Sequence, residues 1–220
     1  MPCDPFEMAL VHRGFRRELH DAPGLVRDAT TGDNTRARVV SAHIDFMMTA
    51  VHFHHSAEDG FVWPKISTRA AIRTAELRRM EEAHRTIDLA GKQVRAIMFP
   101  WAKTGDPQRA DELMSVIGGF AGLVDQHFDD EEENVVPLIA EHLHPKEWRK
   151  FLSHGSAFVR AHPRKGLALG GIVLDGESAE IRDRFLGNLP LPLRAVFKAF
   201  GARIYTGYRT QVYGCSGFDS

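Results

Sequence analysis

Two stretches of the sequence combine histidine and carboxylate side chains in the same pattern. HHSAEDGFVWPKI, which begins at His54, and HFDDEEENVVPLI, which begins at His127, both carry a glutamate four residues after the first histidine and a proline ten residues after it. Four residues make about one helical turn, so His54 and Glu58 share one helix face, as do His127 and Glu131. Each pair can therefore direct an imidazole and a carboxylate at one point, as a metal ion requires.

Single histidines stand in the apolar stripes of two further helical segments. His12 and His84 each lie among apolar residues at helical spacing, and His54 and His127 continue stripes of the same kind. Because such stripes face the core, we expect four helices to direct a histidine inward and two of them to add a glutamate. The apolar members of the four stripes are Met8, Phe15, Leu19, Met47, Val51, Leu77, Met80, Ile87, Val94, Val116, Phe120 and Leu123.

A polar cluster of this size needs compensation inside a helical core. Burying carboxylates and imidazoles without partners costs several kcal/mol per charged group, whereas a whole domain has only about 5 to 15 kcal/mol of net stability. A pair of divalent or trivalent cations would supply the compensation. A closed structural zinc site is more often mononuclear and tetrahedral. Mixed imidazole and carboxylate ligation in a helical bundle suits iron best, and manganese next.

Helix start and stop signals predict the elements that carry these residues. Asp4 and Pro5 begin a helix that ends near residue 20 at DAPG, and Asp106 and Pro107 begin another that ends near Asn134. Between them, helices are expected from about residues 32–36 to Asp59, stopped by Gly60 and Pro64, and over 66–98, stopped by Pro100. Four long helices with short connections predict an all-α fold, an antiparallel up-down four-helix bundle.

The remainder of the chain has a different character. Shorter helical patterns at about 146–160, 177–187 and 191–213 are separated by HPRKG, GGIVLDGES and GNLPLP, and no dense polar cluster occurs there. We therefore expect two domains, the bundle over 1–144 and an appendage of additional C-terminal helices over 145–220. The appendage is expected to pack on the bundle or to mediate a homo-oligomer.

Composition and charge exclude several classes of partner. The 220 residues carry 28 Lys and Arg against 29 Asp and Glu, without a long run of either sign, so neither nucleic acid nor a membrane is expected as a partner. The amino terminus lacks the basic and apolar segments of a secretion signal, which predicts a cytoplasmic protein. Cys3 and Cys215 alone cannot build a disulfide framework within one chain.

The order His12, His54xxxGlu58, His84, His127xxxGlu131, with one element on each helix, resembles the hemerythrin-like (HHE) domain over roughly residues 5–142. Ferritin-like di-iron bundles use the opposite order, Glu-x-x-His. The resemblance implies a non-haem centre of two iron ions, joined by an oxo or hydroxo bridge and by Glu58 and Glu131. Such a centre binds or reacts with dioxygen, hydrogen peroxide or nitric oxide.

The sequence departs from the oxygen-carrying hemerythrins on the third helix. Those proteins place two histidines one turn apart there, whereas Met80 and Asp88 flank His84 at this spacing. His55 is the candidate replacement, because at about 100° per residue Glu58 lies angularly between His54 and His55. The alternative is that His55 faces a neighbouring helix.

Other polar residues near the motifs have plainer interpretations. Asp59 and the acids at 129, 130 and 132 are expected on a solvated face, with hydrogen bonding to ligating imidazoles as the alternative. His52 is expected to face solvent or a partner. His43 is expected to make a hydrogen bond at the bundle end, or else to support a ligand.

Three functions remain open from the sequence. The first is reversible dioxygen binding, the second is catalase-like peroxide disproportionation, and the third is sensing of iron, oxygen or nitric oxide through a protein partner. The histidine missing from the third helix argues against a pure carrier, because a solvent-filled position favours turnover. The C-terminal segment favours sensing.

Overall fold

The computed structural model describes residues 3–29, 34–70 and 74–214, which form helices and turns and contain no strand. They divide into two compact units, Phe15–His142 and Met1–Gly14 with Leu143–Ser220. The helices are α1 (Phe6–Asp28), α2 (Asn34–Ala57), α3 (Trp63–Arg69), α4 (Thr74–Thr104), α5 (Pro107–Asn134), α6 (Val136–His142), α7 (Pro145–Ala161), α8 (Pro163–Leu174), α9 (Ala179–Asn188) and α10 (Leu191–Tyr213), and a π-helical turn, Glu58–Val62, joins α2 to α3.

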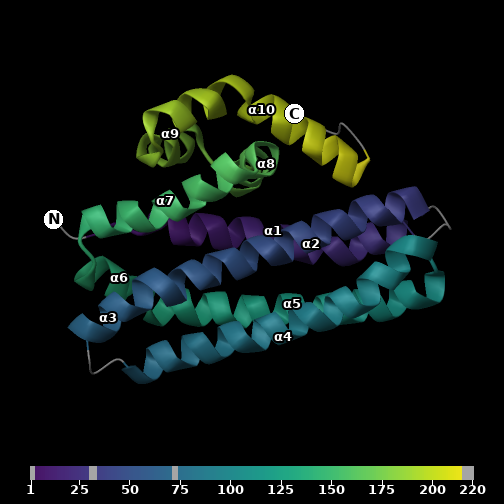
Figure 1. The fold of residues 1–220 in the computed structure, drawn as a ribbon, viewed down its shortest axis with the longest axis horizontal. Helices are drawn as coiled ribbons and strands as arrows, with labels where there is room; N and C mark the ends of the chain where they lie inside the picture. Colours follow the sequence, from purple (N-terminus) through teal and green to yellow (C-terminus); the bar gives the residue numbers. More distant parts are fainter. Residues whose placement is uncertain (1–2, 30–33, 71–73, 215–220) are drawn as a thin grey trace. The chain divides into compact units, whose positions relative to one another are not determined.

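The first unit is a four-helix bundle of α2, α4, α5 and the part of α1 that follows Gly14 (Figure 1). Side-chain pairs show how α2 lies against α4. The Nδ1 atom of His52 is 2.8 Å from Asp88 Oδ1, and the Nε atom of Arg95 donates to Asp45 Oδ1 over 2.7 Å. The earlier contact residue of α2 pairs with the later one of α4, and the later residue of α2 with the earlier one of α4. The two helices are therefore antiparallel.

The other helix pairs of the bundle follow the same rule. Arg16 contacts Asp129 at 2.6 Å and His20 contacts Asp125 at 2.7 Å, which sets α1 antiparallel to α5. Between α4 and α5, the earlier residue Arg79 pairs with Asp130 and the later His84 approaches His127. The predicted all-α antiparallel bundle is thereby confirmed.

Helix α1 is longer than the sequence predicts. The stop signal DAPG was expected to end it near residue 20, but the helix continues through Pro23 to Asp28. Proline removes one backbone hydrogen bond. Burial of Leu25 and Val26 in the following turn offsets this loss, because removing apolar side chains from water stabilises the extra turns.

The end of α2 also differs from the prediction. Gly60 and Pro64 do not end the helical path, because α2 passes through the π-helical turn into α3. Within this turn the Trp63 N–H donates to the Glu58 carbonyl, five residues earlier. Pro64 lies in the first turn of α3, where its missing N–H needs no partner.

The predicted third helix over 66–98 is two helices in the structure. Its beginning belongs to α3, residues 71–73 lie outside the described residues, and α4 continues through Pro100 to Thr104. The predicted start of the fourth helix is confirmed, since the Asp106 side chain accepts a hydrogen bond from the Gln108 N–H at 3.0 Å. Helix α6 follows α5 after Val135.

The second unit contains α7 to α10 and the first turns of α1. The Glu7 carboxyl accepts hydrogen bonds from Trp148 Nε1 at 2.9 Å and from Asn188 Nδ2 at 2.6 Å, and Arg13 pairs with Glu177 at 2.6 Å. These contacts tie α1 to the C-terminal helices, so the two compact units share one helix. The expected domain boundary between 144 and 145 stays a prediction.

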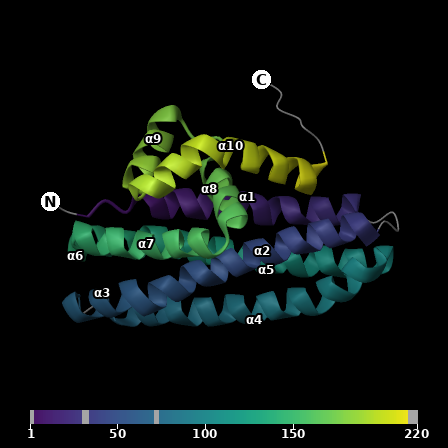
Figure 2. The ribbon, with the colours of Figure 1, turned by 45° about the horizontal axis from the view of Figure 1, so that its top comes forward.

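The sequence predicts connections at HPRKG and GGIVLDGES, whereas the structure has helix α8 over most of this region. Helix α8 contacts both α7 and α10 (Figure 2). The apolar residues Leu167, Ala168 and Ile172 are buried on it. Glycine in the sequence suggested a loop, whereas in the helix Gly170 and Gly171 make room for the aromatic rings of α10.

Gly171→Ala is expected to destabilise the C-terminal unit by about 1 to 3 kcal/mol, the usual cost of overpacking. A Cβ atom at Gly171 would lie 2.4 Å from Tyr205 Cγ. Urea unfolding followed by circular dichroism measures the change. The matched control is Gly207→Ala in α10, where nothing lies within 4 Å of the added Cβ. Equal midpoints for the two variants would contradict the close packing of α8 on α10.

Candidate metal centre

Four potential metal ligands from α2, the π-helical turn, α4 and α5 come together inside the bundle. They are His55, Glu58, His84 and His127, whose ligand atoms lie within 4.8 Å of one another. All four side chains are buried. The π-helical turn supplies Glu58 directly after α2 ends, which brings this carboxylate to histidines from two other helices.

The short distances in this first group join nitrogen and oxygen atoms that can all act as ligands. His84 Nε2 lies 3.1 Å from His127 Nε2 and 3.6 Å from Glu58 Oε2. The His55 and His84 rings are parallel, with centroids 4.1 Å apart and an interplanar angle of 4°. His55 therefore lies beside the single histidine of α4.

A second group of potential ligands shares Glu58 with the first. His54, Glu58 and Glu131 also have ligand atoms within 4.8 Å of one another. His54 Nε2 lies 3.0 Å from Glu58 Oε1, and His127 Nε2 lies 3.6 Å from Glu131 Oε2. Each carboxylate thus lies close to the imidazole of its own motif, and Glu58 belongs to both groups.

His12 is buried on α1, one turn before Phe15 on the same continuous helix. The Phe15 ring lies 5.8 Å from the His54 ring. The predicted stripe of Met8, Phe15 and Leu19 is buried with His12. The sequence thus correctly predicted which face of α1 is apolar and that His12 lies on it.

Both carboxyls of the ligand groups, Glu58 and Glu131, lie in surroundings that disfavour their charged forms. Burial raises the pKa of Glu58 well above its usual value, and the neighbouring charge of Glu131 adds to this effect. Burial also raises the pKa of Glu131, to about 8. The ion-pair partners of Glu58 within the described residues are His54 and His84, with neither lysine nor arginine among them. These ligands therefore fit cations, which would offset the desolvation of the two carboxylates and the repulsion between them.

An aromatic shell surrounds the imidazoles. Phe128 is fully buried, and its ring lies 5.6 to 6.1 Å from the rings of His54, His55 and His127. Trp63, also buried, lies 6.3 Å from the His84 ring. Such a shell lowers the local dielectric and limits access of solvent to a metal.

The sequence analysis did not select Phe128, because two of the three apolar residues that it assigned to the α5 stripe are each one position off, although Phe120 is buried as predicted. Val116 and Leu123 are only partly buried, whereas the fully packed residues are Leu113, Ile117, Phe120, Val124 and Phe128. The stripe that contains Phe128 has the same helical spacing, so the sequence held the signal.

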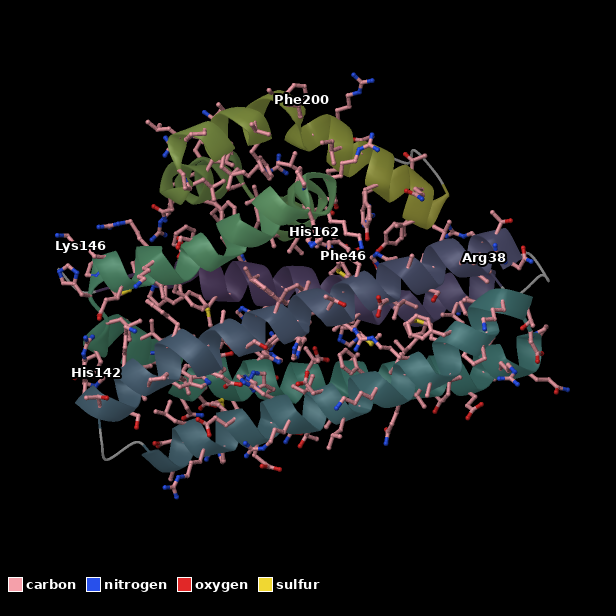
Figure 3. All side chains as sticks on the ribbon, in the orientation of Figure 1. Arg38, Phe46, His142, Lys146, His162 and Phe200 are labelled. Carbon is pink, nitrogen blue, oxygen red and sulfur yellow. The ribbon has the colours of Figure 1, made fainter. Side chains whose placement is uncertain are left out.

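The structure also places the remaining predicted polar residues. His52 is exposed, as predicted, and it pairs with Asp88. The acids of α5 lie in surface ion pairs, Asp129 with Arg16 and Asp130 with Arg79. His142 lies at the end of α6 (Figure 3).

Two positions differ from the plain interpretation. Asp59 does not lie free on a solvated face, because its Oδ1 is 2.8 Å from His84 Nδ1. His43 is buried, and its Nε2 lies 3.5 Å from Oε2 of Glu18, a fully buried carboxyl that the sequence analysis did not select. A glutamate within the apolar face of α1, one turn after Phe15, was the signal for it.

Glu18→Ala is expected to lower the free energy of unfolding by about 1 to 3 kcal/mol, because it removes the partner of a buried imidazole and leaves a void. Urea unfolding measures this change. Glu112→Ala, at an exposed position of α5, is the control and should stay within about 0.5 kcal/mol of the wild type. A wild-type midpoint for Glu18→Ala would show that the pair with His43 does not stabilise the bundle.

Comparisons with known proteins identify the bundle. No curated protein and no solved structure matches the chain. Among the described residues, no helix has both the length and the apolar character needed to cross a membrane. The model of the hemerythrin HHE cation binding domain matches residues 6–139, more than half of the chain, and this span contains both ligand groups. The chain therefore belongs to the hemerythrin HHE cation-binding family.

Proposed function

We propose that the protein is a non-haem di-iron protein that reacts with dioxygen or peroxide, with catalase-like peroxide disproportionation as the leading reaction. The observation that carries this proposal is the pair of ligand groups that share Glu58. Two adjacent groups of imidazoles and carboxylates suit two neighbouring cations. Manganese is the less favoured metal. The proposed ligands are His12, His54, His55, Glu58, His84, His127 and Glu131.

The protein's own contribution is to hold the ligands and to keep the centre dry. His55, His84 and His127 converge on the first position with Glu58. His54 and Glu131 join Glu58 at the second position, and we propose that His12 completes this set from α1. Iron bound there would supply reversible redox change and Lewis acidity towards dioxygen, hydrogen peroxide or nitric oxide. Phe15, Trp63 and Phe128 exclude bulk water.

Metal analysis and activity measurements test the proposal. Protein purified anaerobically from iron-replete cells should contain two irons per chain and show absorption that reduction removes. One zinc per chain, or no metal, would contradict the di-iron assignment. Rapid oxygen evolution from peroxide, lost in His127→Ala and Glu131→Ala, would support the enzyme. A stable oxygenated spectrum that reverses on degassing would instead support a carrier.

Sensing through a protein partner is the second candidate function, and one observation favours it. Residues 1–14, which include His12, group with the C-terminal helices into one compact unit. Glu7, on the same helix as His12, is held by Trp148 and Asn188. A metal ligand on this helix would couple metal binding at the centre to the C-terminal segment. The same segment is the proposed surface for homo-oligomerisation. Removal of iron should then change oligomeric state or partner binding.

A further inference from the structure

We propose that Asp59 is a positioning residue, which orients His84 and increases its affinity for metal. This inference rests on the proposed metal centre. Asp59 Oδ1 lies 2.8 Å from His84 Nδ1, within hydrogen-bond distance. Its side chain is 40% exposed, so Asp59 reaches the imidazole from outside the buried group.

The contact determines which nitrogen of His84 faces the ligand group. With a carboxylate at Nδ1, the proton resides on Nδ1 and the lone pair on Nε2. Nε2 is the atom that lies 3.1 Å from His127 Nε2 and 3.6 Å from Glu58 Oε2. A negative charge behind the ring also makes Nε2 a stronger donor to a cation.

Aromatic contacts restrict the same imidazole. His55 stacks on the His84 ring with centroids 4.1 Å apart, and Trp63 lies 6.3 Å away at an interplanar angle of 26°. These contacts limit the tilt of the His84 ring. They do not distinguish Nδ1 from Nε2, because a ring flipped by about 180° presents the same flat shape to its neighbours. The hydrogen bond to Asp59 makes this distinction.

The π-helical turn presents both acids to His84. Glu58 and Asp59 are consecutive, and the turn closes with the Trp63 N–H donating to the Glu58 carbonyl. Glu58 is fully buried and lies near Nε2, whereas the half-exposed Asp59 lies at Nδ1. One backbone segment therefore supplies a proposed metal ligand and the group that orients a second one.

The test compares Asp59→Ala, Asp59→Asn and Asp59→Glu with the wild type in the full-length protein. Iron content is measured first, and affinity is then measured with cobalt(II) against a competing chelator. The control is Asp88→Asn, which removes a surface carboxylate at the same distance, 2.8 Å, from an imidazole, in this case between α2 and α4. In proton NMR of the cobalt(II) protein each ligating imidazole shows a shifted, exchangeable N–H signal, and the signal absent from His84→Ala is that of His84.

Asp59→Ala should weaken cobalt(II) binding by about 10- to 100-fold, the usual effect of removing a group hydrogen-bonded to a ligating histidine. The shifted N–H signal should exchange faster in Asp59→Ala, and Asp59→Glu should recover part of the affinity. Asp88→Asn should match the wild type. Wild-type affinity and exchange in Asp59→Ala would overturn the inference while leaving the metal centre intact. A wild type that binds neither iron nor cobalt would instead overturn the proposed function.

Discussion

Glu58→Gln is expected to abolish binding of both metal ions, so that iron content falls from about two per chain to near zero. Glu58 is the residue common to the two ligand groups, and it is fully buried. Glutamine preserves the shape of the side chain but removes the negative charge, and a neutral amide is a poor ligand for iron. Loss of this carboxylate therefore acts on both positions at once, whereas His55→Ala should mainly affect the first position.

The same substitution should stabilise the metal-free protein. Burial and the charge of Glu131 disfavour ionisation of Glu58, and a neutral side chain of equal size avoids this cost. Metal analysis measures the loss of iron, and urea unfolding of the metal-free protein measures the gain in stability. Glu133→Gln, at an exposed position of α5, is the control and should retain both iron and wild-type stability. Full iron content in Glu58→Gln would exclude a bridging role for Glu58.

Metal-free protein is expected to become less stable as the pH rises from about 5 to 8. The pKa of Glu131 is raised by burial from 4.5 to about 8, so the folded protein binds a proton in this range that the unfolded chain has released. The contribution of this proton to stability is therefore complete below pH 4.5 and is lost as the pH approaches 8. At about 1.4 kcal/mol per pKa unit, the loss amounts to several kcal/mol.

Urea unfolding of metal-free protein at pH 5 and pH 8 measures this dependence. The difference between the wild type and Glu131→Gln measures the contribution of Glu131 together with its effect on the neighbouring Glu58. Metal should reverse the trend, since cations bind the ionised carboxylates and displace protons, which makes metal binding tighter at higher pH. A Glu131→Gln variant with the full pH dependence of the wild type would rule out this explanation.

The sequence by itself determined the bundle and most of the candidate metal centre. Two HxxxE motifs and two single histidines within apolar stripes specify which helix faces turn inward, because helical spacing fixes direction around each axis. His54, Glu58, His84, His127 and Glu131 could be selected on this basis before any contact was known. The buried apolar neighbours of His12 and His84 confirm the same reasoning for α1 and α4.

Only the tertiary structure decided where His55 and Asp59 lie. On a helix, His55 could face either the centre or a neighbour, and its placement beside His84 depends on how α2 packs against α4. For Asp59 the sequence predicts a solvated face, with a hydrogen bond to a ligating imidazole as the alternative. The π-helical turn continues the chain and brings its carboxylate to His84.

The limits of α1 and the presence of α8 also depended on packing. Local stop signals from Pro23 and from the glycines of α8 each cost only a few kcal/mol at most. Burial of Leu25, Val26 and Ile172 outweighs them, and this burial exists only once other helices are in place. Spacing along one helix is a local property that the sequence carries, whereas contacts between helices arise from the assembled fold.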